Sequence, residues 1–303
     1  MAKNDEFYTQ LSDIEKEMVH YKQHFNGKTI YCNCDDARES NFFKFFSKNF
    51  EFLGLKKLIT TGYKADGKGV ALIYEGDKNG NRNPDDEEIT IKPLQGNGDF
   101  RSPECVEFLK EADIVVTNPP FSLFRQYIAQ LMEYGKKFII IGPQNAITYK
   151  EIFPLFKTNQ IWWGYQCVRW FKTEHQTKLS KIADDGTILT EGDRSRWFTN
   201  LECEKRNRFI DLFRKYSNEC YPHYDNYNAI EVSETKDIPM DYDGVMGVPI
   251  TFLDKYCPDQ FEIVGLMSGA KDEGLLNGND GRAKWYINGK GVYARILIKK
   301  ICA

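Results

Sequence analysis

The chain of 303 residues is 41% hydrophobic and 14% aromatic, which is typical of a globular protein with one large domain or with a large and a small domain. No apolar run is long enough to span a bilayer, and residues 1–10 contain no apolar signal-peptide region, so we expect a soluble cytoplasmic protein without a membrane partner. The net charge of −3 neither indicates nor excludes nucleic-acid binding, because a local basic surface is sufficient for it.

Strands and helices are expected to alternate through the first half of the chain. The polar pattern of residues 4–22 predicts a loop and then a helix. Further on, apolar runs predict strands and the amphipathic runs between them predict helices. We expect strands at residues 29–34, 57–62, 70–75, 89–94, 114–116 and 137–142, and helices at 41–49, 103–111, 122–134 and 149–156. This order predicts an α/β fold built on a doubly wound, mostly parallel sheet.

Two patterns look like metal sites, and we interpret both otherwise. Acidic and amide residues between positions 77 and 88 have the spacing of a calcium-binding loop, but Arg82 occupies the position that needs glycine. We therefore expect a charged surface hairpin that turns at Asn79-Gly80. The eight cysteines have no repeating spacing, and neither Cys32-x-Cys34 nor the later cysteines complete a zinc site, so we predict free thiols and no metal.

The most specific pattern is Thr117-Asn118-Pro119-Pro120-Phe121, which directly follows the β-branched strand at residues 114–116. The residue before a proline is pushed out of the helical region, and two prolines remove two backbone donors and fix two φ angles. The stretch is therefore expected to form a stiff loop at the carboxyl end of a strand, where open α/β sheets bind their ligands.

This loop suits a planar group that carries an NH2. The side-chain oxygen of Asn118 and the carbonyl oxygen of Pro119 can each accept one amino hydrogen, which makes the nitrogen lone pair more nucleophilic. The ring of Phe121 can stack on the plane of the same group. An ordinary turn at the end of a strand is the structural alternative.

Polar loops follow two other predicted strands. Asp35 and Asp36 follow the first strand in a loop without glycine, which suits hydroxyls and an ammonium group better than a phosphate. An acidic first turn favoured by the helix dipole is an equally weighted alternative. Asp99 and Phe100 follow the strand at residues 89–94, where the acid can bind an adenine amino group and the ring can stack on the base.

From residue 161 the pattern changes to short aromatic strand-like pieces, and we expect a mobile polar loop at residues 173–193. Residues 196–202 are expected to lead into a helix that ends near Tyr216, and residues 194–215 carry seven Lys or Arg against three acidic residues. This stretch is a candidate phosphate-binding surface, with a solvated helix face as an equally weighted alternative. Its candidate DNA-binding residues are Arg194, Arg196, Arg206 and Arg208.

Several blocks together resemble the EcoRI-type adenine-specific DNA methyltransferase family, and they span nearly the whole chain. The Asn-Pro-Pro-aromatic loop is shared by many amino-methyltransferases, whereas the C-terminal blocks narrow the resemblance to this family. The blocks are Asn33-Cys34-Asp35-Asp36 with Ser40-Asn41-Phe42-Phe43, residues 117–121, Trp197-Phe198-Thr199-Asn200-Leu201, Asp241-Tyr242-Asp243-Gly244-Val245-Met246-Gly247-Val248-Pro249, and Ile287-Asn288-Gly289-Lys290 with Tyr293-Ala294-Arg295-Ile296-Leu297-Ile298.

The resemblance implies a Rossmann-like methyltransferase fold, S-adenosyl-L-methionine as the methyl donor and N6-methyladenine in double-stranded DNA as the product. It implies a catalytic domain at residues 1–205 and a target-recognition region at residues 206–303. Since the amino group of adenine lies inside the duplex, the nucleotide has to be rotated out. By position the resemblance implies catalytic roles for Asn118, Pro119, Pro120 and Phe121, and cofactor contacts from Phe7, Tyr8, Thr9, Asn33, Asp35, Asp36, Asp99 and Phe100.

Some questions stay open at this point. The strand that ends at Gly62 offers no acid for the cofactor ribose, and Asp66 is the nearest candidate. The catalytic loop alone does not separate adenine from cytosine; the asparagine before the prolines and the C-terminal blocks favour adenine. An RNA or protein-glutamine methyltransferase and a non-catalytic binding protein are alternatives, against which the basic, aromatic C-terminal third and the intact loop argue. The recognition sequence, the oligomeric state and the presence of a cognate restriction endonuclease are not determined.

Overall fold

The structure is a computed structural model, and it describes residues 8–34, 36–37, 39–64, 67–81, 84–173, 180–267, 275–276, 278–279 and 284–301. The chain forms two compact units. The large unit comprises residues 1–144 and 163–201, and the small unit comprises residues 145–162 and 202–303.

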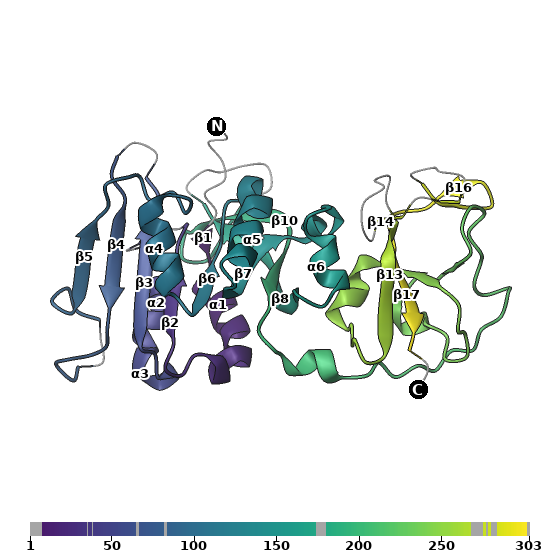
Figure 1. Cartoon of the computed structure of the whole chain (residues 1–303), viewed down its shortest axis with the longest axis horizontal. Helices are drawn as coiled ribbons and strands as arrows, with labels where there is room; N and C mark the ends of the chain where they lie inside the picture. Colours follow the sequence, from purple (N-terminus) through teal and green to yellow (C-terminus); the bar gives the residue numbers. More distant parts are fainter. Residues whose placement is uncertain are drawn as a thin grey trace. The chain divides into compact units, whose positions relative to one another are not determined.

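A mixed sheet of ten strands forms the centre of the large unit (Figure 1). Its order is β1-β8-β10-β7-β6-β2-β3-β4-β5, and β9 pairs with β10 beside this path. The strands are β1 (Tyr8–Thr9), β2 (Thr29–Cys32), β3 (Lys57–Gly62), β4 (Val70–Tyr74), β5 (Ile89–Pro93), β6 (Ile114–Thr117), β7 (Lys137–Pro143), β8 (Trp162–Lys172), β9 (Ser180–Ile182) and β10 (Ile188–Thr199).

The centre of this sheet is parallel. β7, β6, β2 and β3 run in the same direction, whereas β10 pairs antiparallel with β7 and β4 pairs antiparallel with β3 and β5. The α/β class is confirmed, and the expected parallel pairing is found in these four central strands of a mixed sheet. The chain moves from β2 outward to β3 on one side and from β6 outward to β7 on the other, so the direction of winding reverses between β2 and β6. Such a switch point is where open α/β sheets bind ligands.

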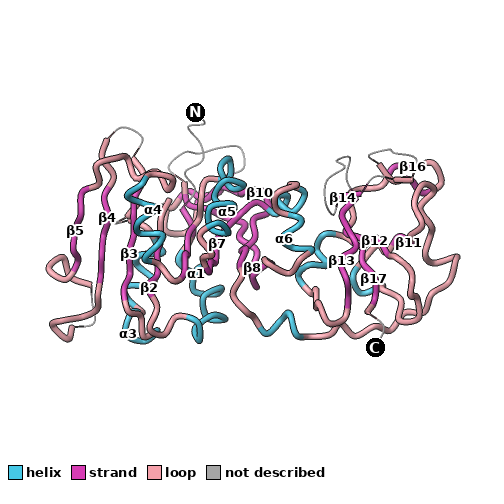
Figure 2. The backbone as a smooth tube through the Cα atoms, in the orientation of Figure 1, coloured by secondary structure: helices cyan, strands magenta, loops and turns pink. Residues whose placement is uncertain are grey.

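Short helices cover the sheet. α4 and α5 lie on one face (Figure 1). α2 connects β2 to β3, and because parallel crossovers are right-handed, it lies on the opposite face. There it packs against α1. Figure 2 separates these helices from the strands by colour. The helices of the large unit are α1 (Leu11–Met18), η1 (Val19–His24), α2 (Asn41–Lys48), α3 (Phe50–Leu53), α4 (Pro103–Glu111), η2 (Phe121–Leu123) and α5 (Phe124–Glu133).

Local sequence explains where these helices begin. The Ser40 side chain accepts the Phe42 N–H at 3.1 Å before α2, and the Ser102 side chain accepts the Cys105 N–H at 3.3 Å before α4. The start of α5 is fixed by packing, because Gly142 on β7 leaves room for the Phe124 ring: a Cβ atom at Gly142 would lie 2.3 Å from it. The helix after β6 is therefore held close to the sheet from its first residue.

The small unit is built on a five-stranded sheet of order β11-β12-β17-β13-β14 with a separate two-stranded hairpin. Its aromatic core contains Trp285, which stacks on Tyr227 with ring centroids 4.0 Å apart. The elements are α6 (Phe153–Lys157), η4 (Glu204–Asn207), β11 (Ile230–Glu231), η5 (Thr235–Asp237), β12 (Met246–Val248), η6 (Ile250–Asp254), β13 (Phe261–Met267), β14 (Leu275–Leu276), β15 (Tyr286–Ile287), β16 (Lys290–Gly291) and β17 (Ile296–Lys300); η3 (Gln144–Thr148) begins at the last residue of the first large-unit segment.

Two expectations for the second half of the chain are wrong. The predicted loop at residues 173–193 contains β9 and the start of β10, which pair as an antiparallel hairpin; residues 174–179 lie outside the described part. The predicted helix that ends near Tyr216 does not form: residues 203–216 are all described, and η4 is the only helical element among them. Distant side chains bind the backbone there instead: the Gln260 amide pairs with both the N–H and the C=O of Ile210, at 2.6 and 2.7 Å. A backbone engaged in this way cannot form helical hydrogen bonds.

The expected hairpin at residues 77–88 is confirmed. The hairpin between β4 and β5 forms, and the Asp77 side chain accepts the Gly80 N–H at 2.7 Å in its turn. The cysteines that the structure describes form no disulfide bond, and the described residues contain no cluster that could hold a metal ion. None of the helices in the described ranges has the length and hydrophobicity that a membrane span requires.

A close backbone crossing brings the loop after β5 to the carboxyl end of β3. Gly98 adopts φ of +82°, and a Cβ atom there would lie 2.2 Å from the Gly62 carbonyl oxygen. The Asn97 carbonyl also accepts the Lys64 N–H at 2.8 Å. Only glycine permits both the left-handed φ and this approach. The crossing carries Asp99 and Phe100 from the edge of the sheet toward its centre.

This crossing predicts a specific cost for a single added methyl group. Gly98→Ala should lower the free energy of unfolding, measured by urea denaturation, by about 1–3 kcal/mol more than Gly80→Ala does, because overpacking is added to the strain. Gly80 is a matched control, because its φ is +81° and a Cβ atom there would meet no other atom within 4 Å. Equal destabilisation of the two variants would show that the crossing is not tightly packed.

Candidate active site

Two loops meet at the switch point of the large sheet. One follows β2 and begins at Asn33; the other follows β6 and begins at Asn118. Because β2 and β6 are parallel, with Tyr31 opposite Val115, both loops leave the same edge of the sheet. The Thr117 hydroxyl donates a hydrogen bond to the Asn33 carbonyl and joins the two strand ends.

The loop after β6 has the stiff form that its sequence predicts. Pro119 is buried, and Asn118, Pro120 and Phe121 are half-buried. The Pro120 carbonyl accepts the Leu123 N–H at 3.0 Å, so η2 begins directly after the prolines. No donor among the residues that the structure describes reaches the Pro119 carbonyl. This carbonyl is therefore available to accept a hydrogen bond from a ligand.

The N-terminal strand β1 lies close to both loops. The Asn41 amide at the start of α2 donates to the Thr9 carbonyl at 2.8 Å. Thr9 also pairs across the sheet with Phe171, whose ring lies 6.4 Å from the Phe121 ring in an edge-to-face arrangement. The Thr9 hydroxyl is buried and has no hydrogen-bond partner within the described part of the chain. Buried hydroxyls are normally paired, so this one points to a ligand. Tyr8 is half-buried beside it, and Phe7 lies outside the described residues.

The loop after β2 turns sharply at Cys34, which adopts a left-handed φ of +69°. Such a conformation costs about 1–3 kcal/mol in a residue other than glycine and is common at functional sites. Asn33 is 3% exposed, and its side-chain oxygen accepts the Tyr127 hydroxyl at 2.5 Å. The Asp36 side chain accepts the Glu39 N–H at 2.9 Å in the loop before α2, and the first turn of α2 contains no acidic residue. Asp35 and Asp66 lie outside the described residues.

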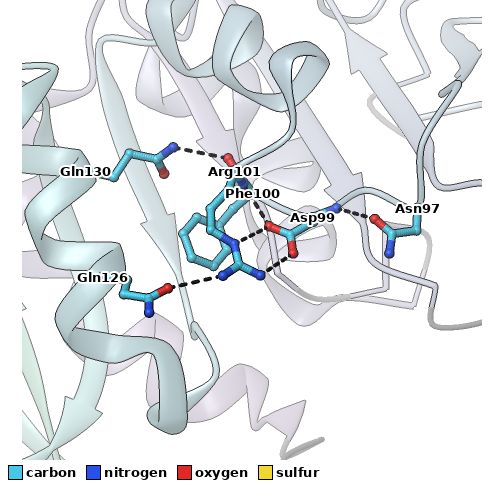
Figure 3. Close-up of polar contacts among 6 residues, drawn as sticks. All are labelled: Asn97, Asp99, Phe100, Arg101, Gln126 and Gln130. Carbon is cyan, nitrogen blue, oxygen red and sulfur yellow. Dashed lines mark hydrogen bonds and ion pairs between the residues drawn. The ribbon is translucent and has the colours of Figure 1, made fainter. Parts of the chain in front are cut away.

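The segment around Asp99 is held by its own arginine (Figure 3). Arg101 donates to both carboxylate oxygens of Asp99, at 2.9 and 2.6 Å, and its third contact is the Gln126 side chain on α5 at 3.1 Å. The hydrogen bonds from Arg101 lower the pKa of Asp99. The Phe100 ring is buried edge-on against Tyr127, with centroids 4.9 Å apart. From the sequence alone, Asp99 is expected to bind adenine; the structure shows that its carboxylate is already paired with Arg101, two residues later.

Arg194 and Arg196 lie at the same edge of the sheet as the two loops. β10 runs antiparallel to β7, and Arg196 stands opposite Gly142 near the carboxyl end of β7. The Arg196 guanidinium donates to the Gln144 side chain at 3.0 Å and lies 4.8 Å from the Trp163 ring. Arg194 is exposed. The structure therefore brings two of the four predicted DNA-binding arginines beside the ends of β6 and β7.

Arg206 and Arg208, in the small unit, differ in their exposure to solvent and in their contacts. Arg206 is 8% exposed; its guanidinium lies 3.7 Å from the Trp162 ring and donates to the Asn159 side chain at 3.0 Å. These contacts make Arg206 part of the packing of the small unit and leave little surface for a phosphate. Arg208 is exposed and makes one long ion pair with Glu204 at 3.5 Å.

Two residues near the loops have no role predicted from the sequence, although one of them, Asn41, lies in a block that resembles the family. Tyr127 joins Asn33 to Phe100, and Asn41 fixes Thr9. Tyr127 lies three residues after Phe124 on the buried face of α5, a pattern that indicates only core packing. No sequence signal distinguishes it from the other buried aromatic residues.

An α/β sheet whose central strand ends in Asn-Pro-Pro-Phe at the switch point is typical of methyltransferases that act on amino groups. Comparison with known proteins agrees with this class. The description of the family named adenine-specific methyltransferase EcoRI matches residues 1–301. The chain is 46% identical to the type II methyltransferase M.EcoRI of Escherichia coli over 98% of this chain and 94% of that protein.

Two mycoplasma proteins are also similar along nearly their whole length. The chain is 39% identical to the type II methyltransferase M.MgeORF184P of Mycoplasma genitalium and 37% identical to the type II methyltransferase M.MpnI of Mycoplasma pneumoniae, in each case over 99% of this chain and 96% of the relative. The chain belongs to the EcoRI-type adenine-specific methyltransferase family and is a DNA methyltransferase.

The different surroundings of Arg206 and Arg208 predict different consequences of removing their charges. Arg206→Met should lower the free energy of unfolding by about 1–3 kcal/mol through the lost hydrogen bond and cation–π contact. It should leave the salt dependence of DNA binding unchanged. Arg208→Met should keep the stability within about 0.5 kcal/mol and flatten the slope of log K against log salt by about one unit. A flattened slope in a fully stable Arg206→Met variant would contradict the structural role.

Proposed function

We propose that the chain transfers a methyl group from S-adenosyl-L-methionine to the N6 amino group of an adenine rotated out of duplex DNA, and that Asn118, Pro119, Pro120 and Phe121 form the catalytic loop. The observation that carries this proposal is the position of the loop at the switch point, with the Pro119 carbonyl not engaged by any described residue. The membership of the adenine-specific family supports the choice of base.

The residues around the two loops fit the methyl donor. The buried Thr9 hydroxyl needs a partner, and the Asn33 amide and Asp36 carboxylate at the end of β2 suit the charged amino-acid end of the cofactor. The Phe100 ring offers an apolar surface for its adenine. We propose that Tyr8, Thr9, Asn33, Asp36 and Phe100 hold the cofactor, and that Asp99 acts mainly through its ion pair with Arg101, which fixes this segment against α5. The cofactor supplies an electrophilic methyl group bound to a sulfonium sulfur.

The catalytic loop prepares the adenine for methylation by position and hydrogen bonding. The Asn118 side-chain oxygen and the Pro119 carbonyl accept the two amino hydrogens and draw the nitrogen lone pair out of conjugation with the ring. The Phe121 ring, supported at its edge by Phe171, stacks on the base. Stiff prolines keep these groups in place, so most of the acceleration comes from orientation rather than from a strong base.

Binding of DNA is assigned to both units. Arg194 and Arg196 at the edge of the large sheet, and Arg208 in the small unit, are proposed to contact phosphates. We propose that the small unit, which contains residues 206–303, reads the target sequence. Its exposed aromatic residues Phe213 and Tyr293, which are 80% and 88% exposed, are available for contacts with DNA.

The product tests the proposal directly. Duplex DNA incubated with the enzyme and S-adenosyl-L-methionine should contain N6-methyladenine and no N4-methylcytosine when its nucleosides are analysed by mass spectrometry. The same DNA without the cofactor is the control. N4-methylcytosine as the main product would refute the choice of base and leave the amino-group chemistry intact, whereas methylated RNA or protein without methylated DNA would refute the substrate.

Removing the Asn118 side chain should separate catalysis from cofactor binding. Asn118→Ala should lower kcat roughly a hundredfold or more, as loss of one oriented polar group in an active site does. Its affinity for S-adenosylhomocysteine, measured by calorimetry, should stay within about threefold, because Asn118 is proposed to touch the base. Asn49→Ala is the matched control: the Asn49 amide donates to Phe45 at 2.8 Å at the end of α2. Loss of S-adenosylhomocysteine binding in Asn118→Ala would contradict the proposal that Asn118 contacts the base and not the cofactor.

A further inference from the structure

Tyr127 is a buried side chain that joins three elements around the candidate active site. It lies on α5, the helix that follows the catalytic loop. Its hydroxyl donates to the Asn33 side-chain oxygen at 2.5 Å, in the loop after β2. Its ring meets Phe100 edge-on at 4.9 Å with an interplanar angle of 72°, in the segment after β5. One residue therefore contacts two of the segments proposed to hold the cofactor.

The hydrogen bond from Tyr127 decides which way the Asn33 amide faces. Two donors converge on the Asn33 oxygen: the Tyr127 hydroxyl and the Cys34 thiol, the latter at 3.4 Å. With the oxygen turned inward, the NH2 group of Asn33 is turned the other way. This NH2 group donates to no residue that the structure describes. Unlike the Thr9 hydroxyl, it remains accessible to solvent. An NH2 group offers two donors and no acceptor, so its ligand has to present an acceptor.

The orientation is stable because the Tyr127 hydroxyl has no alternative state at ordinary pH. Burial raises the pKa of Tyr127 well above its usual value of 10.0, so the hydroxyl stays protonated. The ring is fully buried between the sheet and Phe100 and cannot turn away. The Asn33 backbone is held as well, since its carbonyl accepts the Thr117 hydroxyl.

We propose that Tyr127 is a positioning residue for cofactor binding: it holds the Asn33 amide so that its NH2 group donates to the carboxylate at the amino-acid end of S-adenosyl-L-methionine. This inference rests on the proposed function. An ammonium group cannot be the partner, because it has no acceptor, and a hydrogen bond to a charged carboxylate is stronger than one to a neutral hydroxyl. Without the Tyr127 hydroxyl the amide is free to flip, and its oxygen would then face the carboxylate.

Two ligands that differ only at the amino-acid end test this role. S-adenosylhomocysteine carries the carboxylate, whereas 5′-methylthioadenosine has the same nucleoside and thioether without it. In calorimetry on the full-length protein, Tyr127→Phe should weaken binding of S-adenosylhomocysteine about tenfold, which is about 1.4 kcal/mol, and change binding of 5′-methylthioadenosine less than about twofold. If Tyr127 has only a structural role, Tyr127→Phe should weaken the binding of both ligands equally.

Two further variants keep the test decisive. Tyr31→Phe removes another buried hydroxyl, bonded to the Thr61 hydroxyl at 2.8 Å, and should not discriminate between the ligands. Asn33→Asp replaces the NH2 group with a carboxylate oxygen and should weaken S-adenosylhomocysteine selectively even if Tyr127→Phe folds poorly. If both variants, Tyr127→Phe and Asn33→Asp, bind the two ligands as the wild type does or bind both equally more weakly, the role of Tyr127 is wrong and the proposed function still stands. Absence of any binding to the wild-type protein would overturn the proposed function with it.

Discussion

The parallel pairing of β2 with β6 is the constraint on which the rest of the large unit depends. Parallel neighbours end at the same edge of a sheet, so the loops that begin at Asn33 and Asn118 meet there. An antiparallel pair would place them at opposite ends. The two strands lie where the winding of the sheet reverses, so no crossover helix of either strand covers the space between their loops. The bond from Thr117 to the Asn33 carbonyl then fixes one loop against the other.

Other segments reach this edge because glycine lies at two close approaches, where a side chain would prevent the contact. The crossing at Gly98 brings Phe100 from beyond β5, and the space beside Gly142 lets α5 start directly after the catalytic loop. Tyr127, one turn further along α5, completes the arrangement by meeting Asn33 and Phe100. The active-site edge is therefore assembled from segments far apart in sequence, each positioned by packing in the interior.

The small unit relies on a different kind of interior. A partly buried ion pair joins Arg295 to the buried Glu231 at 2.6 Å, and Glu231 also accepts the Tyr224 hydroxyl beside the aromatic core around Trp285. Breaking one partner of such a network leaves a buried charge and is strongly destabilising. Arg206 over Trp162 follows the same principle. Basic residues in this unit thus serve packing as well as surface charge, whereas the sequence alone assigned Arg206 to the surface.

The sequence by itself determined the α/β class, the limits of most elements in the large unit, the Asn-Pro-Pro-Phe loop and the family. The class, the element limits and the loop depend on local physics: β-branched runs form buried strands, and consecutive prolines stiffen a loop wherever they occur. The family follows from the sequence blocks that resemble it. Only the tertiary structure decided that residues 208–216 are not helical, since Gln260 binds the Ile210 backbone from fifty residues away. Only the tertiary structure paired Asp99 with Arg101 and Gln126, buried Arg206 and placed Tyr127 against Asn33. Each of these depends on which distant partner the fold supplies, and hydrophobic periodicity and motif spacing carry no information about that partner.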